Sequence, residues 1–261
     1  MNHIQLGLRW LTGGWRLFRR NPWLLGAMGF FGAAFSSALA LIPFLGGPLA
    51  AMLAPVFLAS AYLAIETLAG QKLQLPRTLR FAAIKQAPRE LLSVCRDEER
   101  LILTTALALY GLTVGVLANT VVLVVAGSAW SYAFITYDVV AIVRVIVAAL
   151  LVSALYLAFA ASAIFTLPLV YLREQPLFPA MLQSLKASAR YAPAILVVAA
   201  CALGPLMLGG IVYGFSVPAA YTVGFVSAAV ALPVAAAGLY CGYRTVFPKR
   251  PEVQRVKRRN P

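Results

Sequence analysis

Residues 19–48 read RRNPWLLGAMGFFGAAFSSALALIPFLGGP, and the order of residue types in this stretch decides the fold class. Two arginines, an asparagine and a proline precede an uncharged apolar run from Trp23 to Ile42. At 1.5 Å per residue, a run of about 20 residues crosses a hydrocarbon core of roughly 30 Å. The segment Pro43–Gly47 then turns the chain toward a second apolar run. The stretch therefore predicts the start of a helical hairpin that crosses a membrane.

The rest of the chain repeats this alternation. The composition is 62% hydrophobic and 11% charged, with a mean hydropathy of +0.85, whereas a soluble domain carries about 25% charged residues. A soluble fold of this length would expose large apolar patches. We therefore expect an all-α fold, a polytopic transmembrane helix bundle of six spans. The predicted spans cover about 23–42, 48–69, 101–127, 145–172, 194–212 and 219–243.

The basic residues alternate with the spans. Of the 22 Lys and Arg, 21 lie in residues 9–20, 72–100, 173–190 and 244–259, and only Arg144 falls elsewhere. Because basic loops stay on the cytoplasmic side, the N-terminus, both long loops and the tail are predicted to be cytoplasmic, N-in and C-in. This topology accounts for the net charge of +14 without a nucleic-acid partner.

A cleavable signal peptide is the alternative to the first span. Ala38-Leu39-Ala40 resembles a cleavage site, but no polar region separates it from the apolar run. We expect an uncleaved first span.

A base, two residues and a proline recur before each pair of spans, at Arg19–Pro22, Lys85–Pro88 and Arg190–Pro193. Proline in the first turn of a helix needs no N–H partner, so it can start a new helix at an angle to the last one. Amphipathic elbow helices are predicted at about 2–20, 75–99 and 178–191. The chain is then three parallel elbow-helix-plus-hairpin repeats in one membrane domain, 1–247, followed by a basic cytoplasmic tail, 248–261.

The first elbow places Ile4, Leu8, Leu11, Trp15 and Phe18 on one face, and Gln5, Arg9, Thr12, Arg16 and Arg20 on the other. The third has Phe178, Met181, Leu182, Leu185 and Ala189 opposite Gln183, Lys186 and Arg190. Such helices lie in the headgroup layer, and they either only anchor the spans or recognise lipid headgroups. The candidate anionic-lipid contacts are Arg9, Arg16, Arg19, Arg20, Lys85, Lys186, Arg190, Arg255, Lys257, Arg258 and Arg259.

The segment 128–144 is ambiguous. Trp130, Phe134 and Tyr137 follow a helical spacing of aromatic residues that favour the headgroup level. A short helix in the outer interface is one interpretation of this segment.

Gly14–Trp23 and Ile42–Pro48 together resemble the opening of a family of proteobacterial six-span inner-membrane proteins. That family is more distantly similar to the membrane domain of glycerophosphodiester phosphodiesterases. The resemblance covers about the first 90 residues and implies a bacterial inner membrane and six spans. It implies no catalytic residues, and the phosphodiesterase domain itself is not in this chain.

The spans carry few groups that could do chemistry. The only histidine, His3, is near the N-terminus, which argues against metal sites built on imidazoles and against Ser-His pairs inside the spans. We predict no catalytic, cofactor or metal site, and no cofactor. Glu66, near the inner end of the second span, is the one candidate intramembrane polar site. It is either a proton or substrate site or the interface partner of a base such as Lys72.

Small-residue pairs at Gly111/Gly115, Gly210/Gly214 and Gly238/Gly242 predict close helix packing, within the bundle or with a partner. The leading hypothesis is a non-enzymatic membrane protein that binds lipid or another membrane protein, as scaffold, assembly factor or accessory subunit. The alternative is a transporter or channel for a lipid-like or apolar solute, supported by prolines inside the spans; an intramembrane enzyme comes third. The expected partners are anionic membrane lipids and a homo-oligomer or larger membrane complex.

Overall fold

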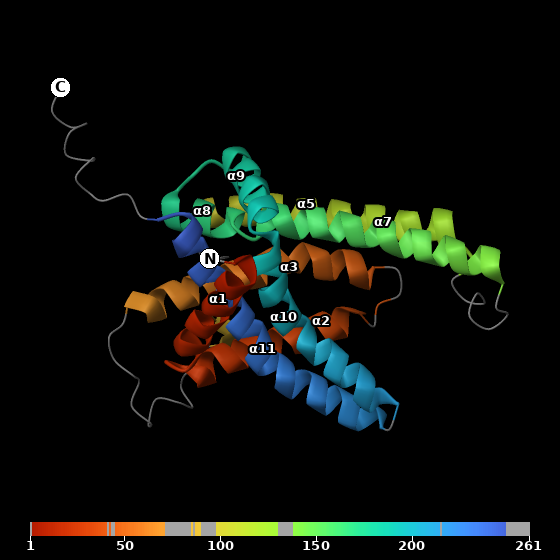
Figure 1. Cartoon of the computed structure of the whole chain (residues 1–261), viewed down its shortest axis with the longest axis horizontal. Helices are drawn as coiled ribbons and strands as arrows, with labels where there is room; N and C mark the ends of the chain where they lie inside the picture. Colours follow the sequence, from red (N-terminus) through yellow and green to blue (C-terminus); the bar gives the residue numbers. More distant parts are fainter. Residues whose placement is uncertain are drawn as a thin grey trace.

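The computed structural model of the chain describes residues 2–40, 42, 45–70, 85, 87–89, 98–129, 138–214 and 216–248. Within these residues every regular element is a helix, and six helices are long and apolar enough to cross a membrane (Figure 1). The predicted multi-pass helical architecture with six spans is confirmed to this extent. The elements are α1 (His3–Phe18), α2 (Pro22–Ala40), α3 (Gly46–Gly70), α5 (Glu98–Val121), the π-helix η3 (Val122–Ala126), α7 (Val139–Ala163), α8 (Thr166–Arg173), α9 (Leu177–Arg190), α10 (Ala192–Tyr213) and α11 (Val217–Val246).

Three predicted segments fall wholly or largely outside the described residues. They are most of the elbow at 75–99, the aromatic segment 130–137 and the tail beyond Pro248. After the aromatic segment, α7 begins at Val139 rather than near 145. The Asp138 side chain accepts a hydrogen bond from the Val140 N–H at 3.0 Å and so caps this earlier start.

The two described elbows turn by the predicted chemistry. Pro22 opens α2, and the Asn21 side chain caps this helix by accepting from the Leu24 N–H at 3.1 Å. Arg20 ties this turn to the end of α3, where its Nη1 donates to the Leu68 carbonyl at 3.0 Å. At the third elbow, Pro193 lies in the first turn of α10.

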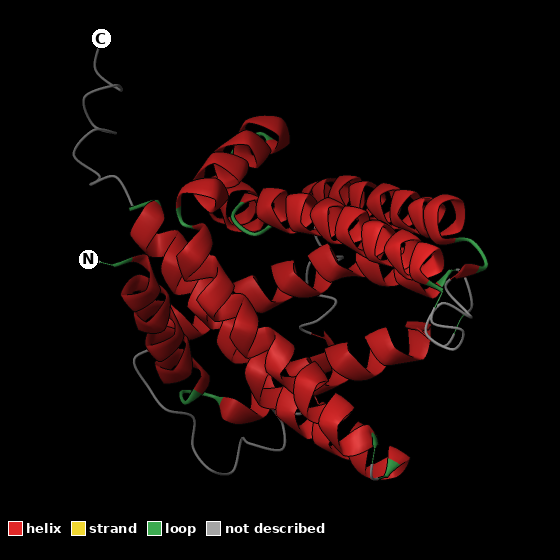
Figure 2. Cartoon of the chain, turned by 45° about the vertical axis from the view of Figure 1, so that its right-hand side comes forward, coloured by secondary structure: helices red, strands yellow, loops and turns green. Residues whose placement is uncertain are grey.

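The long helices diverge from a common region. In Figures 1 and 2 the α5–α7 pair and the α10–α11 pair run outward in different directions, with α2 and α3 between them. The buried core lies where α1, α8 and the C-terminal halves of α3 and α11 meet. It includes Trp10, Phe18, Tyr62, Ile65, Phe165, Leu167 and Tyr240.

Glycines set the closest helix approaches. A Cβ on Gly111 would lie 2.4 Å from the Ala51 carbonyl oxygen, which places α5 directly against α3. A Cβ on Gly242 would lie 2.8 Å from the Trp10 ring of α1. These two glycine pairs pack within the bundle as predicted, whereas a Cβ on Gly210 would meet nothing within 4 Å.

The fourth span is interrupted between α7 and α8. Pro168 has no N–H to donate to the Ile164 carbonyl, and the Tyr62 hydroxyl of α3 donates to that oxygen instead, at 3.2 Å. The Phe165 N–H donates to Ser184 Oγ of α9 at 3.1 Å, and the same Oγ donates to the Ala161 carbonyl at 2.9 Å. The backbone groups at the break thus find hydrogen-bond partners on two neighbouring helices, α3 and α9. Beyond the break, α8 runs toward the C-terminal end of α11.

Candidate functional site

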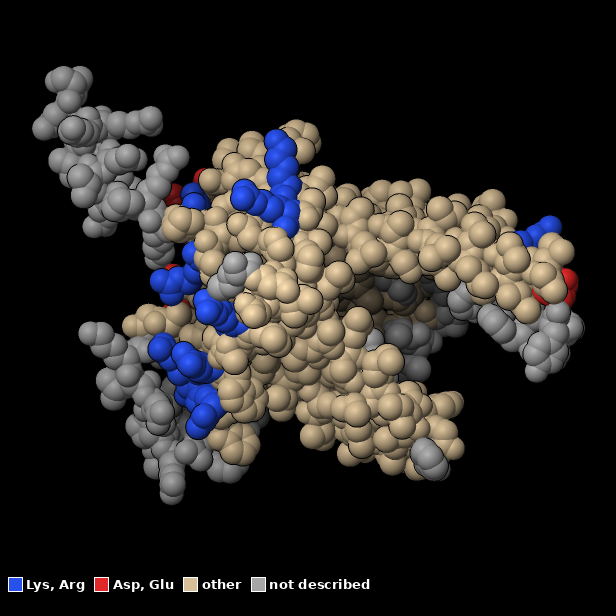
Figure 3. All heavy atoms as spheres, viewed as in Figure 1, with Lys and Arg blue, Asp and Glu red and all other residues tan. Residues whose placement is uncertain are grey.

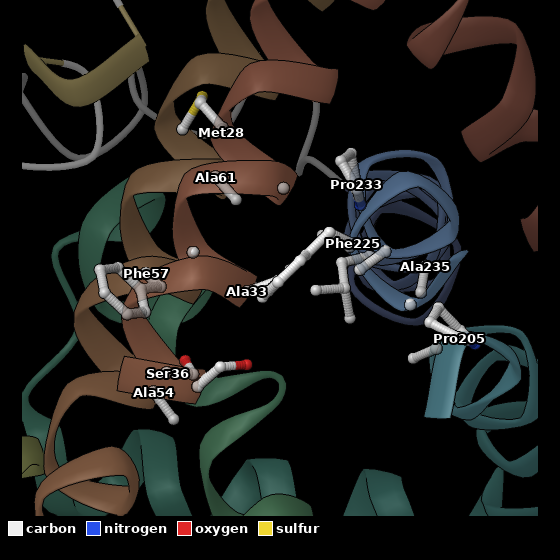
Figure 4. Close-up of a pocket in the computed structure, with 18 of the residues that line it drawn as sticks. Met28, Ala33, Ser36, Ala54, Phe57, Ala61, Pro205, Phe225, Pro233 and Ala235 are labelled. Atoms are coloured by element: carbon white, nitrogen blue, oxygen red, sulfur yellow. The ribbon is translucent and has the colours of Figure 1, made fainter. Parts of the chain in front are cut away.

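A cavity of about 690 Å³ lies between α2, α3, α10 and α11. Figure 4 shows side chains from α2 and α3 on one side of it and from α10 and α11 on the other. Along α11 its lining runs from Ala220 to Leu239, which at 1.5 Å per residue is about 28 Å, most of the thickness of a hydrocarbon core. The cavity therefore extends along the helices rather than across one level of the bundle.

The lining of this apolar cavity contains no charged residue. Its polar groups are limited to the hydroxyls of Ser36, Ser37, Tyr213 and Tyr221. The remainder is aliphatic, aromatic, proline or glycine. A lining of this kind favours apolar ligands, because a water molecule there finds few polar partners.

Small residues make the apolar cavity wide. Gly32 and Gly224 line it, and a Cβ on either would meet nothing within 4 Å. Pro205 and Pro233, which lie inside α10 and α11, line it as well. The space exists because the α10–α11 pair diverges from the other helices and no large side chain fills the gap between them.

A second, smaller cavity of about 220 Å³ lies at the C-terminal ends of α3, α8 and α11. We call it the inner cavity; it is lined by Glu66, Leu172, Arg173, Tyr240, Tyr243, Arg244, Phe247 and Pro248. In contrast to the apolar cavity, it brings two guanidinium groups and one carboxylate together.

Hydrogen bonds arrange the charged groups of the inner cavity. The Tyr240 hydroxyl donates to the Glu66 carboxylate. Arg173 Nε donates to the Tyr243 hydroxyl at 3.1 Å, and its Nη2 donates to the carbonyls of Phe247 and Pro248, the latter at 2.9 Å. The Arg173 guanidinium also lies 5.6 Å from the centroid of the Tyr243 ring, a cation–π distance. Arg173 therefore fastens the C-terminal end of α11 to α8.

The linings of the two cavities include consecutive residues of α3 and of α11. Ile65 and Leu239 line the apolar cavity, and the next residue on each helix, Glu66 and Tyr240, lines the inner cavity. The Tyr240–Glu66 hydrogen bond thus marks a change from hydrocarbon-like to charged surroundings. Glu66, the predicted intramembrane polar residue, is half-buried here; the proposed partner Lys72 lies outside the described residues.

The candidate lipid-contacting bases separate into three groups. Arg9, Arg16 and Arg19 of α1 and Lys85, Lys186 and Arg190 are exposed. Figure 3 shows Lys and Arg side chains gathered around the end of the molecule that carries α1 and α9. Arg20 is exposed too, but it donates to carbonyls at the end of α3. Arg255, Lys257, Arg258 and Arg259 lie outside the described residues.

Helix α1 has three sides rather than the two that its amphipathic pattern indicates. Gly7, Trp10, Gly14 and Phe18 are buried against the bundle, and Trp10 is only 2% exposed. Ile4 and Leu8 are each 52% exposed, next to the basic side. The predicted apolar face is thus largely an exposed one, apart from the buried Phe18 and the half-buried Leu11.

Helix α9 follows the same plan. Ala180, Ser184, Ala187 and Ser188 are buried, whereas Phe178, Leu182 and Leu185 are exposed. Sequence reasoning missed the buried sides of both helices. The signal was the helical spacing of small residues, which hydropathy hardly registers.

Sequence reasoning also missed the apolar cavity and the role of Arg173, Tyr240, Tyr243 and Arg244. Among the residues that the structure describes, no group of three or more His, Cys, Asp or Glu could hold a metal ion. No family model, curated protein or solved structure matches the chain.

Proposed function

We propose that this chain is a non-enzymatic integral membrane protein that binds lipid, with lipid hydrocarbon held in the apolar cavity. The observation that carries the proposal is an uncharged cavity of about 690 Å³ in a chain with six helices suited to cross a membrane. Its volume is within the range of about 300–1,000 Å³ that small-molecule sites have. Such binding suits a scaffold, assembly factor or accessory subunit of a membrane complex.

The exposed sides of α1 and α9 support the same function. Each combines apolar side chains with bases, the arrangement by which a helix lies in a headgroup layer that carries negative charge. We further propose that the chain has its N- and C-termini in the cytoplasm of a bacterium, across the inner membrane. The predicted three elbow-and-hairpin repeats belong to this proposal, supported by the position of α1 before α2–α3 and of α9 before α10–α11.

Filling the apolar cavity tests the proposal. Gly32→Leu and Gly224→Leu place side chains where a Cβ meets no neighbour, so they reduce the volume without forcing helices apart. Ala200→Leu is the matched control, because Ala200 is exposed on α10 and does not line the cavity. We expect the two glycine variants to purify in a mild detergent with less bound lipid, measured by mass spectrometry, than the wild type and the control. Equal lipid content in all four proteins would contradict the proposal.

A transporter of lipid-like solutes is the second candidate, because Pro205 and Pro233 lie inside two helices at the cavity itself, and each removes a backbone hydrogen bond there. Reconstitution into vesicles separates the two functions. A transporter accelerates the movement of a fluorescent lipid between leaflets, and Gly224→Leu slows it. A scaffold holds lipid without accelerating this movement.

A further inference from the structure

We infer that the inner cavity receives the headgroup phosphate of the bound lipid, so that the ligand is an anionic phospholipid whose hydrocarbon lies in the apolar cavity. The inference rests on the proposed function and names its ligand. It starts from the linings of the two cavities, which include consecutive residues of α3 and of α11.

Charge selects the headgroup. Arg173 and Arg244 provide two guanidinium groups, against the single carboxylate of Glu66, so the inner cavity has a net positive charge. The Tyr240 hydroxyl bonds to that carboxylate and leaves it less available to a cationic headgroup. The net positive charge attracts a headgroup that carries only the negative phosphate more strongly than one that also carries an ammonium.

Arg244 is the anchoring base. The Nε and Nη2 of Arg173 are engaged by Tyr243, Phe247 and Pro248. Arg244 lines the same cavity, and its side chain also interacts with the Tyr240 hydroxyl; because Arg244 is exposed, its guanidinium can still meet a ligand. Guanidinium groups bind phosphate through paired, charge-assisted hydrogen bonds.

Along α3 the apolar cavity is about as long as one leaflet is deep, although its lining along α11 is longer, about 28 Å. Along α3 the apolar cavity is lined from Ala54 to Ile65, about 16 Å by helical rise. One leaflet contributes half of a hydrocarbon core of roughly 30 Å. A phospholipid with its phosphate at the level of Glu66 therefore has room for its acyl chain up to Ala54.

The test uses the purified full chain in a neutral detergent and two lipids with the same fluorophore-bearing acyl chains, phosphatidylglycerol and phosphatidylcholine. We expect the wild type to bind phosphatidylglycerol at least about tenfold more tightly than phosphatidylcholine. This difference in affinity is on the scale of one hydrogen bond to a charged group. Arg244→Gln should weaken the binding of phosphatidylglycerol more than that of phosphatidylcholine, whose phosphate contacts the same base, and so remove most of this preference. Arg244→Lys, which keeps the charge but not the paired geometry, should retain part of it. Arg144→Gln, at an exposed base of α7, is the control and should bind as the wild type does.

Equal affinities of the wild type for the two lipids, or an undiminished preference in Arg244→Gln, would overturn the inference. Displacement of phosphatidylglycerol by millimolar inorganic phosphate would also overturn it, because the site would then serve free phosphate. Gly224→Leu separates this failure from that of the proposed function. If this variant weakens the binding of both lipids while no headgroup preference exists, only the inference fails; if it weakens neither, the proposed function fails.

Discussion

At the residue scale, the Ser184 hydroxyl bridges the two ends of one backbone hydrogen bond, from the Phe165 N–H to the Ala161 carbonyl, in the interrupted fourth span. This hydroxyl is buried, accepts from the Phe165 N–H and donates to the Ala161 carbonyl. Ser188, one turn later, donates to the same carbonyl at 2.9 Å. The two serines therefore differ in consequence although they look equivalent in sequence.

We expect Ser184→Ala to lower the free energy of unfolding by about 1–3 kcal/mol, because it leaves the buried Phe165 N–H without a partner. Ser188→Ala should cost less, since the Ala161 carbonyl keeps the bond from Ser184. Unfolding in mixed micelles, followed by tryptophan fluorescence, measures both. A larger loss for Ser188→Ala would show that the break is held in another way.

The Glu66 carboxylate is predicted to be dispensable for assembly. Glu66→Gln keeps an oxygen that can accept from the Tyr240 hydroxyl and removes one negative charge beside Arg173 and Arg244. Expression and folded yield should stay close to those of the wild type, and affinity for phosphatidylglycerol should stay the same or rise. Weaker phosphatidylglycerol binding by a well-folded Glu66→Gln protein would contradict this account of the inner cavity.

At the scale of elements, α1 is held in the bundle by a side that hydropathy does not reveal. A Cβ on Gly14 would lie 2.5 Å from the Gly238 nitrogen and from the Val234 carbonyl oxygen of α11. Backbone atoms cannot yield as a flexible side chain can. This contact holds α1 against the C-terminal half of α11 (Figure 2).

Gly14→Ala should therefore destabilise the protein by about 2 kcal/mol or more, as overpacking does, and should expose Trp10. Gly32→Ala is the matched control, because its Cβ has open space and alanine favours a helix by up to about 1 kcal/mol. Acrylamide quenching of tryptophan fluorescence and unfolding curves give the two readouts. If both variants are equally stable, the close contact at Gly14 is not what holds α1 against α11.

The sequence predicts what depends on apolar runs and on charge, namely six spans and the elbow helices at α1 and α9. Pro168 predicts a break or kink in the fourth span, but the sequence does not predict how the freed backbone groups are satisfied, because their partners Tyr62 and Ser184 lie on distant segments. The inner cavity could not be predicted from the sequence for the same reason. Glu66, Arg173 and Arg244 are far apart in the chain, and only tertiary packing brings them together.

At the scale of the whole molecule, charge predicts the orientation. Cysteine labels in a cysteine-free background should react from outside on one set of positions and from the cytoplasm on another. The expected external sites are Leu45, Ile135 and Phe215, and the expected cytoplasmic sites are Trp15, Lys85, Leu185 and Arg255. External labelling at Lys85 would contradict the repeat model, because the second elbow would lie on the wrong side.

The divergence of the α10–α11 pair from the rest of the bundle creates the apolar cavity, and lipid within that cavity is the central claim. A phospholipid with a photoreactive group in its acyl chain tests it most directly, by cross-linking in membranes followed by peptide mapping. We expect cross-links to concentrate on cavity-lining residues such as Phe57 and Phe225, above the level on Val143 and Leu150, which are exposed on α7. Cross-links at the same level on α7 as in the cavity would contradict the account, since the cavity would then hold lipid no better than the outer surface does.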